Sequence, residues 1–78
     1  MSVEVKGLIV EIFKIRENEY NLGLTMDDVP NWDSLKHMEL ITRVESDYDI
    51  VLDLEEIVSM RSVNSIIETL KGKGVSID

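Results

Sequence analysis

Ser34 and His37 are the residues of this sequence most open to nucleophilic catalysis, because they stand three positions apart in Asp33-Ser34-Leu35-Lys36-His37. A serine becomes a nucleophile when a neighbouring histidine takes its proton and a carboxylate orients that histidine. On a helix Ser34 and His37 would be neighbours. Both would lie at an exposed helix start, where nothing excludes water or forms an oxyanion site. The sequence therefore does not predict a hydrolase, and His37 is expected to be a solvated surface residue.

Acidic residues further along the chain have a spacing similar to that of the ligands in a calcium-binding loop. Glu45, Asp47 and Asp49 alternate, and Glu56 follows Glu45 by eleven positions. The sixth position of such a loop needs glycine for its sharp turn, but Ile50 occupies it. These acidic residues are better interpreted as a solvated helix end that leads into the next helix cap. No metal site is predicted.

Composition excludes several classes of function. The chain has 78 residues, which is about half of an average domain, so we expect one small domain spanning 1–78. Cysteine is absent, which excludes disulfides, thiolate metal sites and a cysteine nucleophile. The net charge of −8 argues against nucleic acid or an anionic membrane as a partner. We expect a soluble, monomeric, cytoplasmic protein, since no segment is apolar enough to be a signal peptide or a membrane span.

The N-terminal part predicts one helix and one long loop. The helix is expected from about Ser2 to Arg16, with Ser2 as its N-cap. The loop runs from Glu17 to Trp32, and its length indicates that it packs on the body of the domain or carries function. Apolar residues predicted to face the core are, in the helix, Val5, Leu8, Ile9, Ile12 and Phe13 and, in the loop, Leu22, Leu24, Met26, Val29 and Trp32.

A second helix is predicted from Asp33 or Ser34 to about Asp47, with Asp33 as its N-cap. Its apolar stripe places Met38 in the core by default. Residues 48–53 contain Ile50-Val51-Leu52, which could form a strand, but an extended connector is preferred because no partner strand is in sight. The residues of the stripe are Leu35, Met38, Ile41, Val44 and Tyr48, with Leu40 widening it.

Two further helices complete the predicted fold. Asp53 can cap a short helix through Val58, and Ser62 can cap a last one that ends at Lys71-Gly72. Residues 72–78 are expected to be a frayed tail. Three longer helices and one short helix predict an all-α, four-helix bundle with a long loop between the first and second helices.

The segment Asp33-Ser34-Leu35, followed by Glu39-Leu40, resembles the acyl carrier protein family, which includes peptidyl and other stand-alone carriers. The order and spacing of the surrounding elements agree with it from Val3 to Leu70. The resemblance implies a four-helix carrier fold and a protein that is not itself an enzyme. The rival interpretation is a non-carrier acidic helical module, without a prosthetic group, that only docks a partner.

The resemblance implies that 4′-phosphopantetheine is attached to the hydroxyl of Ser34. A separate, magnesium-dependent phosphopantetheinyl transferase would transfer it from coenzyme A. Asp33 and Leu35 are the flanking motif residues, and Asp33 would either orient the loop or contact the metal of the transferase. The protein would then carry acyl or aminoacyl groups as thioesters and present them to enzymes of fatty-acid, polyketide or related biosynthesis.

The resemblance also implies partners that read the second helix through its acidic residues. These partners would be the transferase, an acyl-loading ligase or transferase, and synthase enzymes. Lys36, His37 and Arg43 interrupt the acidic surface and, together with Trp32, indicate a specialised carrier loaded by an adenylating ligase. Trp32 could instead close the loop onto the bundle, and Leu35 could serve the interface or the core. Predicted partner contacts are Glu39, Glu45, Asp47, Glu55, Glu56, Lys36 and Arg43.

Overall fold

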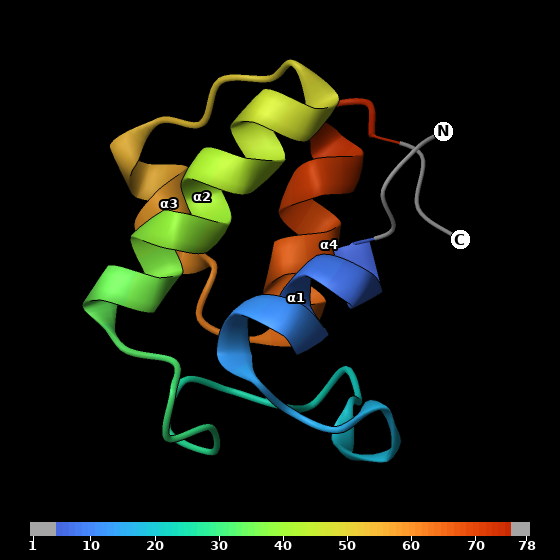
Figure 1. The fold of residues 1–78 in the computed structure, drawn as a ribbon. Helices are drawn as coiled ribbons and strands as arrows, with labels where there is room; N and C mark the ends of the chain where they lie inside the picture. Colours follow the sequence, from blue (N-terminus) through green and yellow to red (C-terminus); the bar gives the residue numbers. More distant parts are fainter. Residues whose placement is uncertain (1–4, 76–78) are drawn as a thin grey trace.

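The structure, a computed structural model, describes residues 5–75 and has the predicted all-α fold of four α-helices (Figure 1). Within this range the only β pairing is an isolated bridge between Thr25 and Ser62, so the connector at 50–52 is not a strand, as predicted. The helices are α1 (Val5–Phe13), α2 (Ser34–Tyr48), α3 (Leu54–Ser59) and α4 (Val63–Gly72), and a short 3₁₀ helix, η1 (Glu17–Glu19), lies in the long loop.

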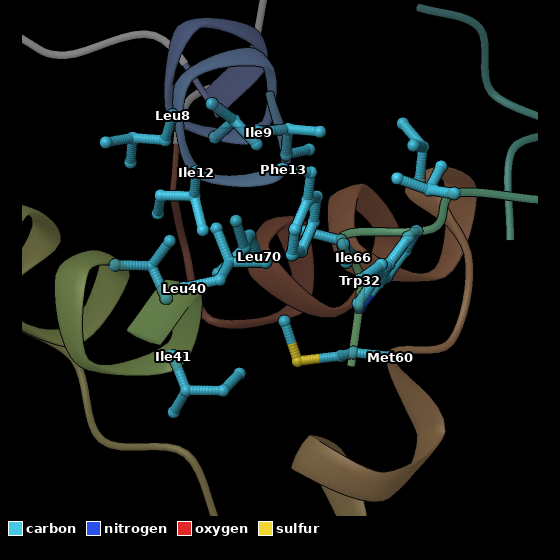
Figure 2. Packing of buried hydrophobic residues seen from close by; sticks show 14 of the residues in the cluster. Leu8, Ile9, Ile12, Phe13, Trp32, Leu40, Ile41, Met60, Ile66 and Leu70 are labelled. Atoms are coloured by element: carbon cyan, nitrogen blue, oxygen red, sulfur yellow. The ribbon is translucent and has the colours of Figure 1, made fainter. Parts of the chain in front are cut away.

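Apolar side chains from three of the four helices meet in the core (Figure 2). α1 buries all five residues predicted for it, and it packs against α2. α3 contributes no fully buried side chain, although Met60, directly after it, is completely buried. α3 therefore lies on the surface of the bundle and depends on its caps and on polar contacts more than the other helices do.

α1 is shorter than predicted. It ends at Phe13, and Lys14 has a positive φ of 53°, which stops the helix before Arg16. The predicted N-cap, Ser2, lies outside the described residues. Ile15, beyond the end of the helix, still packs against the core as a partly buried residue.

The long loop is held by side chains and by backbone. Val29 and Trp32 are buried, as predicted, and Leu24 and Met26 are half-buried. Leu22 is 52% exposed, which corrects its assignment as an anchor. Its carbonyl oxygen instead accepts a hydrogen bond from the backbone N–H of Asn64 at 3.1 Å. The backbone of Leu22, rather than its side chain, ties this part of the loop to α4.

α2 begins at Ser34, with Asp33 as N-cap, and ends at Tyr48, one residue beyond the prediction. Its buried face differs from the predicted stripe. Leu35 is 76% exposed and Met38 is 48% exposed, whereas His37 is buried. The buried residues of α2 are therefore His37, Leu40, Ile41 and Val44.

α4 begins after its N-cap Ser62, as predicted, and extends to Gly72. The residue with positive φ is Gly74, at 89°, and not Gly72. Residues 73–75 fold back onto the helix, where the backbone N–H of Val75 donates to the carbonyl of Leu70 at 3.0 Å. Backbone hydrogen bonds thus tie residues 73–75 to the end of α4, and residues 76–78 of the predicted tail lie outside the described part of the chain.

An ion pair links the end of α4 to the start of α3. The N-cap Asp53 accepts from the backbone N–H of Glu56 at 2.8 Å, and the carboxylate of Glu56 accepts from the backbone N–H of Asp53 at 3.0 Å. The same carboxylate lies 2.8 Å from Nζ of Lys73. The Asp53 backbone N–H and then Lys73 lower the pKa of Glu56, and Glu56 raises the pKa of Lys73.

Lys73→Gln is expected to change how stability depends on pH. Both partners are charged between their ordinary pKa values, 4.5 for Glu56 and 10.5 for Lys73. Because the pKa of Glu56 is lowered in the folded protein, its contribution to folding stability falls as the pH drops below 4.5. Because the pKa of Lys73 is raised, its contribution to folding stability falls as the pH rises above 10.5. Urea unfolding at steps from pH 7 to pH 3 should show a shallower acid loss for Lys73→Gln than for wild type. Lys71→Gln is the matched control, because Lys71 pairs with Glu68 at 3.9 Å on one exposed face; equal pH profiles for the two variants would contradict the expectation.

Candidate functional site

Ser34 is exposed at the first position of α2. Asp33 adopts an extended backbone, and its Oδ1 accepts from the backbone N–H of Lys36 at 2.9 Å, which fixes the turn from loop to helix. The backbone N–H groups of Ser34 and Leu35 have no carbonyl four residues earlier within the helix. Within residues 5–75 the hydroxyl of Ser34 makes no hydrogen bond. The hydroxyl is therefore accessible and not committed to the fold.

His37 is only 7% exposed, which corrects its expected place on the surface. Its Nδ1 accepts a hydrogen bond from Nε1–H of Trp32 at 3.0 Å, and its Nε2 lies 2.8 Å from the carbonyl oxygen of Ile57. Because the indole can only donate, the ring proton of His37 lies on Nε2 and is donated to Ile57. Both ring nitrogens are thus occupied, and His37 is not free to act as a base toward Ser34.

Trp32 closes the loop onto the bundle. It is 3% exposed, and its ring stacks on that of Phe13 with centroids 4.5 Å apart and planes inclined by 18° (Figure 2). Through His37 it also reaches the carbonyl end of α3. This arrangement favours the interpretation that Trp32 closes the loop onto the bundle over the interpretation that it contacts a partner protein directly. The sequence signal was an aromatic residue just before the helix cap and a lone histidine one turn into the helix.

A groove of about 330 Å³ lies between α2 and α3 beside Ser34. We call it the Ser34 groove. Its size is near the lower end of the roughly 300–1,000 Å³ typical of ligand sites. It explains why Met38, Leu54 and Val58 remain partly exposed although they are apolar. The residues that line it are Met26, Ser34, His37, Met38, Leu54, Ile57, Val58 and Arg61.

The predicted partner residues divide into exposed and engaged side chains. Glu39, Asp47 and Glu55 are exposed. Oε2 of Glu45 accepts from the backbone N–H of Leu52 at 2.9 Å and so holds the connector after α2. Glu56 is engaged at the cap of α3, as described above. The exposed acidic residues are therefore three of the five predicted, and two of these, Glu39 and Asp47, also lie within 4.0 Å of a basic neighbour.

The two basic residues predicted at the partner surface pair with acidic neighbours. Nζ of Lys36 lies 3.4 Å from Oε1 of Glu39. Arg43 lies 4.0 Å from both Glu11 and Asp47. Pairs of this exposure contribute little to stability, so these side chains can exchange one partner for another.

Residues 5–75 contain neither a metal-binding cluster nor a membrane-spanning helix. This part of the chain contains no cluster of three or more acidic or histidine side chains placed to hold a metal ion. Its helices are too short or too polar to cross a membrane.

Known proteins resemble this chain along most of its length. No family model matches it. An acyl carrier protein of Petrotoga mobilis is 27% identical over 70 residues, which cover 90% of this chain and 82% of that protein. A solved structure from Mycobacterium tuberculosis, provisionally assigned as an acyl carrier protein, superposes with a TM-score of 0.71 at 20% identity and covers 87% of this chain and 90% of its own. The chain therefore has the acyl carrier fold and resembles an acyl carrier protein in sequence over most of its length.

Proposed function

We propose that this protein is an acyl carrier, which bears 4′-phosphopantetheine on Ser34 and carries acyl or aminoacyl groups as thioesters. It would present them to enzymes of fatty-acid, polyketide or related biosynthesis. The observation that carries the proposal is the position of Ser34, exposed and unbonded at the start of α2 beside the Ser34 groove. The similarity to acyl carrier proteins over most of the chain supports it.

The residues around Ser34 fit a phosphodiester-linked arm. The free backbone N–H groups of the first turn and the helix dipole favour a negative charge there by up to about 1 kcal/mol. Asp33, already bonded to the backbone of Lys36, would orient the serine for the transferase. The arm would supply the thiol that a chain without cysteine lacks.

Other exposed residues of the helices would form the surface that partner enzymes recognise. Glu39, Asp47 and Glu55 are exposed acidic groups near Ser34 or along the same helices, and Leu35 offers an exposed apolar contact directly beside it. Charge steering raises encounter rates without making a complex too tight to leave, which suits a shuttle. The monomeric, cytoplasmic state and the single domain expected from the sequence are part of this proposal.

Intact-mass measurement tests the proposal against the rival docking module. The protein is incubated with coenzyme A, magnesium and a promiscuous phosphopantetheinyl transferase, with a known carrier in the same tube as a positive control. A gain of about 340 Da, mapped to Ser34 by peptide fragmentation, is expected for one phosphopantetheine arm. An unmodified Ser34 beside a fully modified control would reject the carrier function and favour the docking module.

A further inference from the structure

Arg61 is the only charged side chain among the residues that line the Ser34 groove. Most of the lining is apolar, and the two ring nitrogens of His37 are already bonded to Trp32 and Ile57. Besides the Ser34 hydroxyl, Arg61 is thus the residue with free polar capacity in this groove. It also lines a second, more polar hollow, together with Asp27, Ser62 and Ser65.

Arg61 has no acidic partner within 4.0 Å in the described part of the chain. In the described part of the chain Lys6, Lys14 and Arg16 also lack such a partner, but none of these three lines the Ser34 groove. Each of Lys36, Arg43, Lys71 and Lys73, by contrast, lies within 4.0 Å of a carboxylate. The positive charge of Arg61 is therefore available to a group from outside the polypeptide.

The backbone of Arg61 is fixed at the junction between α3 and α4. Its N–H donates to the carbonyl of Ser59 at 2.9 Å, and its carbonyl accepts from the N–H of Met26 at 3.1 Å. The side chain therefore begins from a defined point on the groove wall. The ordering that ligand binding requires is therefore confined to the rotamers of this one side chain.

We propose that Arg61 is an anion-binding residue of the Ser34 groove, which holds a negatively charged oxygen of the group tethered to Ser34. The inference rests on the proposed function. The planar guanidinium binds phosphate and carboxylate oxygens through two parallel N–H groups. Two sources supply such oxygens: the phosphodiester of the arm, and a carboxylate at the far end of a short acyl group. Tethering gives either source a high effective concentration, so a weak contact is enough.

NMR of the ¹⁵N-labelled protein separates the two sources. Four forms are compared: unmodified, carrying the arm alone, and carrying the arm loaded with an acetyl or a malonyl group. The observed signal is the Nε–Hε pair of Arg61, with those of Arg16 and Arg43 as internal references. A shift of this signal, with solvent exchange of Hε slowed roughly threefold or more, is expected when an anionic oxygen binds. If the Arg61 signal shifts in all three modified forms, the bound group is the phosphodiester. If it shifts in the malonyl form alone, the bound group is the carboxylate.

Variants and masses make the outcome decisive. Arg61→Gln should shift the ³¹P resonance of the arm if the phosphodiester is bound, or reduce the difference between the backbone ¹H–¹⁵N spectra of the malonyl and acetyl forms if the carboxylate is bound, while Arg43→Gln should do neither. An Arg61 signal that moves no more than those of Arg16 and Arg43 in every modified form overturns the inference and leaves the carrier function intact. The mass of each form is measured first, so failure to modify Ser34 is recognised separately and overturns both proposals.

Discussion

Replacing Ser34 with alanine is expected to abolish the gain of about 340 Da completely, from full modification to none. The hydroxyl is the only group proposed to accept the arm, and it makes no hydrogen bond within residues 5–75. Alanine is a good helix former, and exposed substitutions usually change stability by less than about 0.5 kcal/mol. The loss should therefore be chemical, with the helix content and melting temperature of the variant unchanged.

Ser59→Ala is the matched control for this loss. Ser59 is also an exposed helical serine, and its hydroxyl donates to the backbone carbonyl of Glu56 at 2.8 Å. This variant should gain the same mass as wild type under the same conditions. Modification of Ser34→Ala by the same increment would place the attachment elsewhere and contradict the assignment of Ser34.

Local signals made most of the fold predictable. Asp33, Asp53 and Ser62 each accept a hydrogen bond from a backbone N–H three residues later, and each was predicted as an N-cap from its type and position. The core positions of α1 followed from spacing alone, because that helix buries one face made of Val5, Leu8, Ile9, Ile12 and Phe13. The sequence was therefore sufficient to predict a helix when the residues that determine its start and its buried face lie within or next to that helix.

The site was predictable only in part. Ser34 and its exposure followed from the motif and the cap. The burial of His37 did not, because one of its partners, the carbonyl of Ile57, is twenty residues away and belongs to another helix. Met38 was assigned to the core because it shares the helical spacing of Ile41, whereas in the structure it lines the Ser34 groove and is 48% exposed. The place of Arg61 in the groove depends on tertiary contacts that bring the loop near Met26 to the α3–α4 junction.

Trp32→Ala is expected to cause the largest loss of stability, about 3–5 kcal/mol, as measured for large buried aromatic residues. The substitution leaves a cavity beside Phe13, removes the stacked pair and leaves Nδ1 of buried His37 without its donor. Urea unfolding followed by circular dichroism measures the change, since the variant lacks the only tryptophan. A loss below about 1 kcal/mol would contradict this account of the loop closure.

Trp32→Phe separates packing from hydrogen bonding. Phenylalanine keeps an aromatic ring against Phe13 but cannot donate to His37, so its cost should fall to about 1–3 kcal/mol, the penalty of one unsatisfied buried acceptor plus a smaller ring. Small domains have about 5–15 kcal/mol of stability in all, so this variant should stay folded even where Trp32→Ala does not. Because His37 bonds directly to α3, the loss of its indole partner should also loosen the wall of the Ser34 groove. A larger increase in amide hydrogen exchange over wild type in α3 than in α1 of Trp32→Phe would show this, and equal increases in the two helices would mean that Trp32 supports the core alone.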